Sequence, residues 1–123
     1  MDISKLSSVK EMRETYIHEA AHLFSDGCGH DFVFSFFHNI FLRTVGCAFS
    51  EIEYEYRDCD WRLSILENIE LSKGFVQIAL DQKLDSRYWN LIRSYFQMYS
   101  NVPGDTIEDK FTLFRKYCNS ILP

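Results

Sequence analysis

The stretch of sequence that decides the fold is residues 31–45, which read DFVFSFFHNIFLRTV. It is rich in phenylalanine and is bounded by Gly29 and Gly46. Its length favours a helix that is buried over much of its circumference, because buried strands are generally shorter. A pair of short buried strands is the alternative. Polar residues such as His38 and Arg43 interrupt it, so it falls short of the roughly 20 apolar residues that a membrane-spanning helix needs.

A first helix is predicted upstream of this stretch, over Val9–Phe24. Ser8 and Glu11 form the pattern of a capping box, in which two side chains satisfy backbone amides at the start of a helix. Apolar residues then recur at steps of three and four, as they do on one face of an α-helix. Gly27, which is free to adopt a positive φ, supplies the stop. The predicted apolar stripe consists of Val9, Met12, Tyr16, Ala20 and Leu23.

Two more helices are predicted in the C-terminal part of the chain. Asp85, or the serine after it, caps a helix over Ser86–Tyr99, and Thr106 caps a helix over Ile107–Ile121. Both segments repeat apolar residues at helical spacing. A Val-Pro-Gly-Asp sequence between them favours a turn, because proline fixes φ and glycine permits a chain reversal.

The middle of the chain is less regular. Residues 49–57 alternate apolar residues with glutamates, which is typical of a strand. The same residues also carry a capping-box pattern and helical spacing, so the two interpretations have equal weight. A helix over residues 60–72 follows and is ended by Gly74. A short helix or a strand is then predicted over residues 75–84.

Length and composition fit one folded domain that spans residues 1–123. The chain is 46% hydrophobic and 16% aromatic, which is ample material for a single core. We therefore predict a mostly α-helical, compact single-domain bundle of five or six helices. A short β-hairpin around residues 47–57 is the alternative for that segment.

The cysteines and the N-terminal residues favour a cytoplasmic protein. The N-terminal residues are polar and charged, without the apolar core of a secretory signal. The cysteines lie far apart and include no C-x-x-C pair, so we expect reduced thiols that act mostly as small core residues. They are Cys28, Cys47, Cys59 and Cys118.

One motif indicates a metal. Residues 18–22, His-Glu-Ala-Ala-His, match H-E-x-x-H and in this respect resemble the zinc metalloproteases. On a helix, His18 and His22 lie on one side and can share a zinc ion, while Glu19 acts as a base on the bound water. The candidates for a third ligand are His30, Glu51 and Glu53.

Helix geometry argues against this metal. At about 100° per residue, both histidines lie roughly 180–220° from Val9, on the side opposite the predicted apolar stripe. We therefore expect His18 and His22 to lie on the solvated face or under a neighbouring helix. We also expect no stoichiometric zinc and no cofactor.

A second enzymatic alternative concerns Arg13 and His18. Their R-x4-H spacing is similar to that of the HEPN ribonucleases, which are helical proteins of comparable size. The two side chains lie about 140° apart on an ideal helix. We expect them to be unrelated surface residues, and we predict that the chain is not an enzyme.

The net charge of the chain is confined to one segment. Between residues 51 and 70, seven acidic residues stand against Arg57 and Arg62, a local charge of −5 that equals the net charge of the chain. Clustered carboxylates repel one another, so folding alone does not favour them. With interleaved aromatic residues they suit a docking surface for a basic protein, whereas the alternative is a solvated face with its aromatic residues in the core. The predicted partner-binding residues are Glu51, Glu53, Tyr54, Glu55, Tyr56, Asp58, Asp60 and Trp61.

This profile predicts an inhibitor rather than an enzyme. Acidity argues against direct binding to nucleic acid or to an anionic membrane, and nucleases are basic where they meet phosphate. In composition the chain is similar to bacterial immunity proteins against nuclease toxins and to phage anti-CRISPR proteins. We therefore predict a cytoplasmic bacterial immunity protein (antitoxin), monomeric or weakly dimeric, that neutralises a basic nuclease toxin. A phage-type inhibitor is the alternative.

Overall fold

The computed structural model describes residues 3–25, 31–98 and 102–123, with side chains from residue 12 onward except residue 24. Within these ranges the chain forms five α-helices and two short 3₁₀-helices, and no strand. The mostly α-helical fold class is thereby confirmed, and the segment around residues 47–57 forms a 3₁₀ turn and irregular backbone instead of a hairpin. The elements are α1 (Ile3–Ser25), α2 (Phe32–Thr44), η1 (Glu53–Tyr56), α3 (Ile65–Asp81), η2 (Ser86–Tyr88), α4 (Trp89–Met98) and α5 (Ile107–Ile121).

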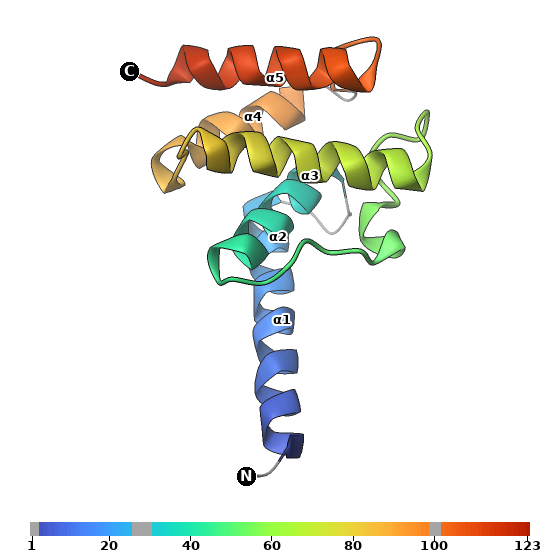
Figure 1. Cartoon of the computed structure of the whole chain (residues 1–123), viewed down its shortest axis with the longest axis vertical. Coiled ribbons are helices and arrows are strands. Elements are labelled where there is room, and N and C mark those ends of the chain that lie inside the picture. The colour runs from blue at the N-terminus through green and yellow to red at the C-terminus, as the bar shows by residue number, and fades with distance from the viewer. Residues whose placement is uncertain (1–2, 26–30, 99–101) are drawn as a thin grey trace.

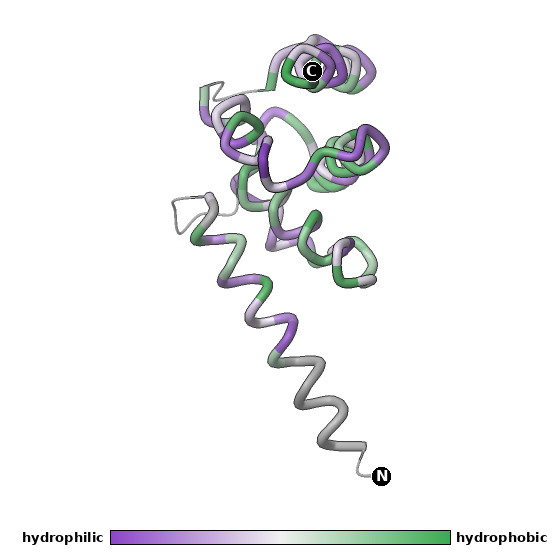
Figure 2. Tube along the Cα trace, turned by 90° about the vertical axis from the view of Figure 1, so that its left-hand side faces the viewer, coloured by the Kyte–Doolittle hydropathy of each residue, from purple (hydrophilic) through white to green (hydrophobic). Residues whose placement is uncertain are grey.

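Helix α2 lies at the centre of the molecule and contacts α1, α3 and α4 (Figure 1). Asp31 caps it by accepting a hydrogen bond from the Phe34 amide, and every residue from 32 to 40 is buried. The prediction of a helix buried over much of its circumference is therefore confirmed. The N-terminal half of α1 extends away from the other helices (Figure 1; Figure 2), while α3 and α5 lie side by side at the far end.

Aromatic rings make up much of the core. One buried phenylalanine from each of α2, α3, α4 and α5 meets the others at the centre, namely Phe36, Phe75, Phe96 and Phe114. Their ring centroids are separated by 4.8 Å for Phe75 and Phe114 and by 6.4 Å for Phe36 and Phe114. Such separations are those of favourable tilted and edge-to-face ring pairs.

Helix α1 buries a different face from the one predicted. Met12, Tyr16 and Leu23 of the predicted apolar stripe are 72%, 78% and 79% exposed. The buried face carries Ile17 and Ala21 instead. The side of α1 that packs on α2 also carries His18 and His22, whose rings contact Phe34 of α2. The start of α1 also differs, because the helix begins at Ile3 and the predicted cap at Ser8 lies inside it.

Helix α3 is one helix where the sequence predicted two elements. It begins after Ser64, which forms a capping box with Glu67, and it continues through Gly74 to Asp81. Gly74 was expected to end a helix, but its role is in packing. A Cβ atom at this position would collide with the ring of Phe111 in α5, so the missing side chain lets α3 and α5 approach closely.

The last two helices begin at the predicted caps. Asp85 caps η2, which leads directly into α4, and Thr106 caps α5. The turn before α5 is held by Lys110, whose buried ammonium donates hydrogen bonds to the carbonyls of Val102 (2.7 Å) and Gly104 (3.0 Å). The predicted stop at Gly27 and helix end at Tyr99 lie outside the described residues. Of the helices described, none is both long enough and apolar enough to span a bilayer.

The described cysteines are free thiols. Cys118 is fully buried, and Cys47 and Cys59 are partly buried. Burial raises the pKa of Cys59 and of Cys118 to about 12, which keeps both in the unreactive thiol form. Cys28 lies outside the described residues.

Candidate functional site

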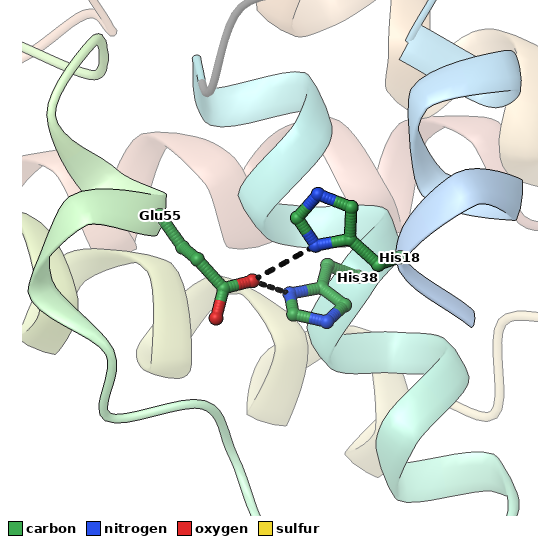
Figure 3. A group of neighbouring side chains, drawn as sticks. All are labelled: His18, His38 and Glu55. Carbon is green, nitrogen blue, oxygen red and sulfur yellow. Dashed lines mark ion pairs between the residues drawn. The ribbon is translucent and has the colours of Figure 1, made fainter. Parts of the chain in front are cut away.

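Three side chains from separate elements converge at one point. His18 of α1, His38 of α2 and Glu55 of η1 point toward one another (Figure 3). Oε2 of Glu55 lies 2.8 Å from Nδ1 of His38 and 3.4 Å from Nδ1 of His18. Atoms able to ligate a metal, one from each residue, all lie within 4.8 Å of one another. We call His18, His38 and Glu55 the histidine–glutamate cluster.

Glu55 is a buried carboxylate. It is 3% exposed, and its Oε1 accepts a hydrogen bond of 2.9 Å from the Ser50 hydroxyl. Burial opposes its ionisation, but His38, Ser50 and His18 together outweigh burial and hold its pKa below the ordinary value of 4.5. Oε2 has no well-aligned hydrogen-bond donor among the described residues, in spite of its short distance to His38. That contact is therefore mainly electrostatic.

The position of Glu55 depends on hydrogen bonds that attach residues 50–56 to α2. Asn39 is fully buried; its Nδ2 donates to the Tyr56 hydroxyl (3.0 Å), and its Oδ1 accepts from the Ser50 amide (2.8 Å). The Tyr56 hydroxyl in turn donates to the Ser50 carbonyl at 2.6 Å. Burial is the main reason that the pKa of Tyr56 rises to about 12. Segment 50–56, which includes η1, is thus held on α2 by side-chain hydrogen bonds.

The two histidines of the H-E-x-x-H pattern face the body of the molecule rather than open solvent. Nε2 of His18 and Nε2 of His22 are 3.1 Å apart, and His22 stacks on Phe34 with ring centroids 4.4 Å apart. Of the two predicted locations, the one under a neighbouring helix is therefore the one that the structure has. Glu19 is exposed, and His30 lies outside the described residues.

The two residues of the R-x4-H pair lie in different surroundings. Arg13 is exposed on α1, whereas His18 is directed toward Glu55 and His38. An RNA phosphate at Arg13 would also lie beside exposed Glu14. Arg13 is therefore a surface residue, as predicted, whereas His18 is not.

A pocket of about 650 Å³ opens over the histidine–glutamate cluster. All three residues of the cluster line it, together with Thr15 and Glu14 of α1 and residues of the segment that follows α2. A water molecule or a small ligand in the pocket can therefore reach the cluster. Chemically, the cluster can act as a metal-binding site or as a buried network that exchanges protons between imidazole and carboxylate.

Five of the eight predicted partner-binding residues are exposed: Glu51, Glu53, Tyr54, Asp58 and Trp61. Trp61 is 86% exposed and Tyr54 is 51% exposed. Arg57 lies over the Tyr54 ring at 5.7 Å from its centroid, and Lys73 of α3 pairs with Glu51. We call these five residues the acidic surface.

The other three, Glu55, Tyr56 and Asp60, are buried and maintain the structure of the segment. The Asp60 carboxylate accepts hydrogen bonds from the backbone and the guanidinium of Arg62, at 3.0 and 3.2 Å. Burial opposes ionisation of Asp60, but Arg62 outweighs it and holds the pKa below the ordinary value of 3.8. The three residues therefore do not belong to the exposed docking surface.

Sequence reasoning missed His38, Ser50 and Asn39 as site residues. In the sequence, His38 stands out only as an interruption of an apolar stretch. A signal was nevertheless present, because polar side chains in a helix that is buried all round need partners. Those partners come from residues 50–56, and only the tertiary structure identifies them.

Comparison with known proteins gives no relative: no protein-family model matches the chain, and neither a curated protein nor a solved structure matches it significantly.

Proposed function

We propose that this chain is a cytoplasmic inhibitor that binds and neutralises a basic protein, with a nuclease toxin as the class of partner and a bacterial immunity protein as its role. The observation that supports the proposal is the acidic surface, in which exposed carboxylates and exposed aromatic side chains share one short segment. A basic nuclease offers the complementary charge, because it must be positive where it binds phosphate.

The aromatic residues provide anchors for such a partner. Trp61 is 86% exposed, and Leu66 at the start of the next helix is 73% exposed. Large apolar side chains in water gain about 25 cal/mol per Å² when a partner covers them. Tryptophan and tyrosine are also the residue types that most often dominate the binding energy of an interface. Tyr54, half exposed, is a further anchor.

The exposed carboxylates provide attraction at long range. Glu53 and Asp58 are exposed, and so is Glu70 on α3. Burial of Glu55 and Asp60 leaves five of the seven acidic residues of segment 51–70 for this attraction, and three of those five belong to the acidic surface. Charges at the rim of an interface act mainly on the association rate and its salt dependence.

The test begins with the reading frames next to the gene for this chain. A basic product among them is purified, its nuclease activity is measured with and without the chain, and binding kinetics are followed at two salt concentrations. We expect stoichiometric inhibition, slower association for Glu53→Lys and Asp58→Lys, and a dissociation constant raised by roughly 30-fold or more for Trp61→Ala. Asp81→Lys makes the same charge change at an exposed position, at the end of α3 opposite to the one that follows Trp61, and is the matched control.

Two results would contradict the proposal. One is the absence of any basic reading frame beside the gene. The other is a complex whose association rate and salt dependence respond no more to Glu53→Lys and Asp58→Lys than to Asp81→Lys.

A further inference from the structure

We propose that the histidine–glutamate cluster binds one divalent transition-metal ion, namely Zn²⁺, at the base of the pocket. The inference is independent of the inhibitor function, and either one can fail alone. From the sequence we expected no zinc, because His18 and His22 lie opposite the predicted apolar stripe and no third ligand is placed beside them. The structure supplies a different set of three residues, in which His38 and Glu55 join His18.

The donor set is one that zinc uses. Two imidazoles and one carboxylate, with a fourth position left open, form a known type of zinc site. Bond lengths of about 2.0–2.2 Å place the ligand atoms of a tetrahedral ion roughly 3.3–3.6 Å apart. Glu55 Oε2 lies 3.4 Å from His18 Nδ1 and 2.8 Å from His38 Nδ1, and the ligand atoms of all three residues lie within 4.8 Å of one another, so shifts of roughly an ångström give the required spacing.

The surroundings of the Glu55 carboxylate favour a bound cation. Ser50 donates a hydrogen bond to Oε1 of Glu55, which leaves Oε2 directed at the two histidines. A buried carboxylate oxygen without an aligned donor is costly, and a metal ion would compensate it. The Asn39 hydrogen bonds to Ser50 and Tyr56 hold this carboxylate in place from both sides.

The two histidines are also oriented for metal binding. Both present Nδ1 to Glu55. With His18 bound through Nδ1, its Nε2 carries the proton and donates to Nε2 of His22, 3.1 Å away. A metal-ligating histidine almost always has such a partner on its second nitrogen, because the partner fixes the ring and the tautomer. His22 is thus a positioning residue, and the pocket leaves the fourth coordination position accessible to water.

The experiment uses the full chain without a histidine tag, stripped of metal by a chelator. Zn²⁺ is titrated into it by calorimetry, with Mg²⁺ as the comparison ion, and Co²⁺ is titrated with visible absorption as the readout. We expect one Zn²⁺ per chain, no heat with Mg²⁺, and an absorption spectrum of four- or five-coordinate Co²⁺. Glu55→Gln and His38→Gln remove ligands and should each weaken Zn²⁺ binding by more than roughly 100-fold, whereas His22→Gln should weaken it by roughly tenfold to 100-fold.

The matched control is Glu14→Gln, which removes another carboxylate that lines the same pocket and should leave Zn²⁺ affinity unchanged. If Glu55→Gln or His38→Gln does not fold, the test uses the ¹⁵N chemical shifts of the histidine rings in the wild-type protein. Zinc should shift the Nδ1 resonances of His18 and His38. No saturable Zn²⁺ binding at one per chain would overturn the proposal. So would binding that survives Glu55→Gln and His38→Gln, or a zinc-dependent shift at Nε2 of His18 and His22, which would place the ion in the H-E-x-x-H pair instead.

Discussion

At the residue scale, Asn39 has the greatest effect on the pocket, because one side chain both donates to Tyr56 and accepts from Ser50. Asn39→Ala leaves the buried Ser50 amide without its acceptor and removes the donor to the Tyr56 hydroxyl. We expect it to lower the free energy of unfolding by about 1–3 kcal/mol, measured by urea denaturation. Asn90, whose side chain bonds to Arg93 on the exposed face of α4, is the control, and Asn90→Ala should change the free energy by less than about 0.5 kcal/mol. Equal effects of the two substitutions would show that the Asn39 bonds do not stabilise the segment.

Asp60 makes the free energy of unfolding depend on pH. Its folded pKa lies below 3.8, so the stability that it contributes is fully present above pH 3.8 and is lost as the pH falls through the folded pKa. Asp60→Asn should therefore be less stable than the wild type at pH 6, and the difference should shrink as the pH falls below 4. Arg62→Gln should reduce this pH dependence, since it removes the guanidinium donors and keeps the backbone amide of residue 62. Urea unfolding at pH 3, 4 and 6 measures both, and a difference that does not change with pH would contradict the assignment.

At the scale of elements, α1 provides a test of which face is buried. Tyr16 is 78% exposed and Ala21 is fully buried against α2. Tyr16→Glu should change the free energy of unfolding by less than about 0.5 kcal/mol. Ala21→Leu should lower it by about 1–3 kcal/mol, because the added side chain overpacks the contact with α2. The opposite order of the two effects, read by thermal or urea unfolding, would restore the face predicted from the sequence.

The contact between α3 and α5 depends on Gly74. In an exposed helix, replacing glycine by alanine stabilises by about 0.5–1 kcal/mol. Here the new methyl group would collide with Phe111, so we expect Gly74→Ala to be destabilising. Phe111→Leu should relieve part of that cost, and the two substitutions should then be non-additive in a double-mutant cycle of unfolding free energies. Additive effects would mean that Gly74 and Phe111 do not meet.

At the scale of the whole molecule, the sequence was sufficient to predict the structural features that depend on local pattern. Caps at Asp85 and Thr106 and the phenylalanine-rich stretch of α2 predicted helices that the structure has. What failed depends on distant partners. The exposed side of α1 could not be recognised without α2, and Gly74 could not be identified as a packing residue without Phe111.

The same limit applies to charge. The sequence placed all of the net charge in one segment but gave no means to separate carboxylates in water from those with an internal partner. Glu55 and Asp60 have the same residue types as their exposed neighbours, and their burial follows from histidines on α1 and α2 and from Arg62. Alternation indicates which side chains share a face, but not what lies opposite that face.

The attachment of residues 50–56 to α2 has a kinetic consequence. The Ser50 amide hydrogen is bound to a side chain, so it can exchange with deuterium only when the Asn39 contact opens. The same local opening frees Tyr56 and withdraws Glu55 from the histidines, because these residues are joined through Ser50. The exchange rate of this one amide therefore reports how often the pocket opens. A ligand that binds Glu55 stabilises the closed state, and the exchange of the Ser50 amide should slow by the same factor.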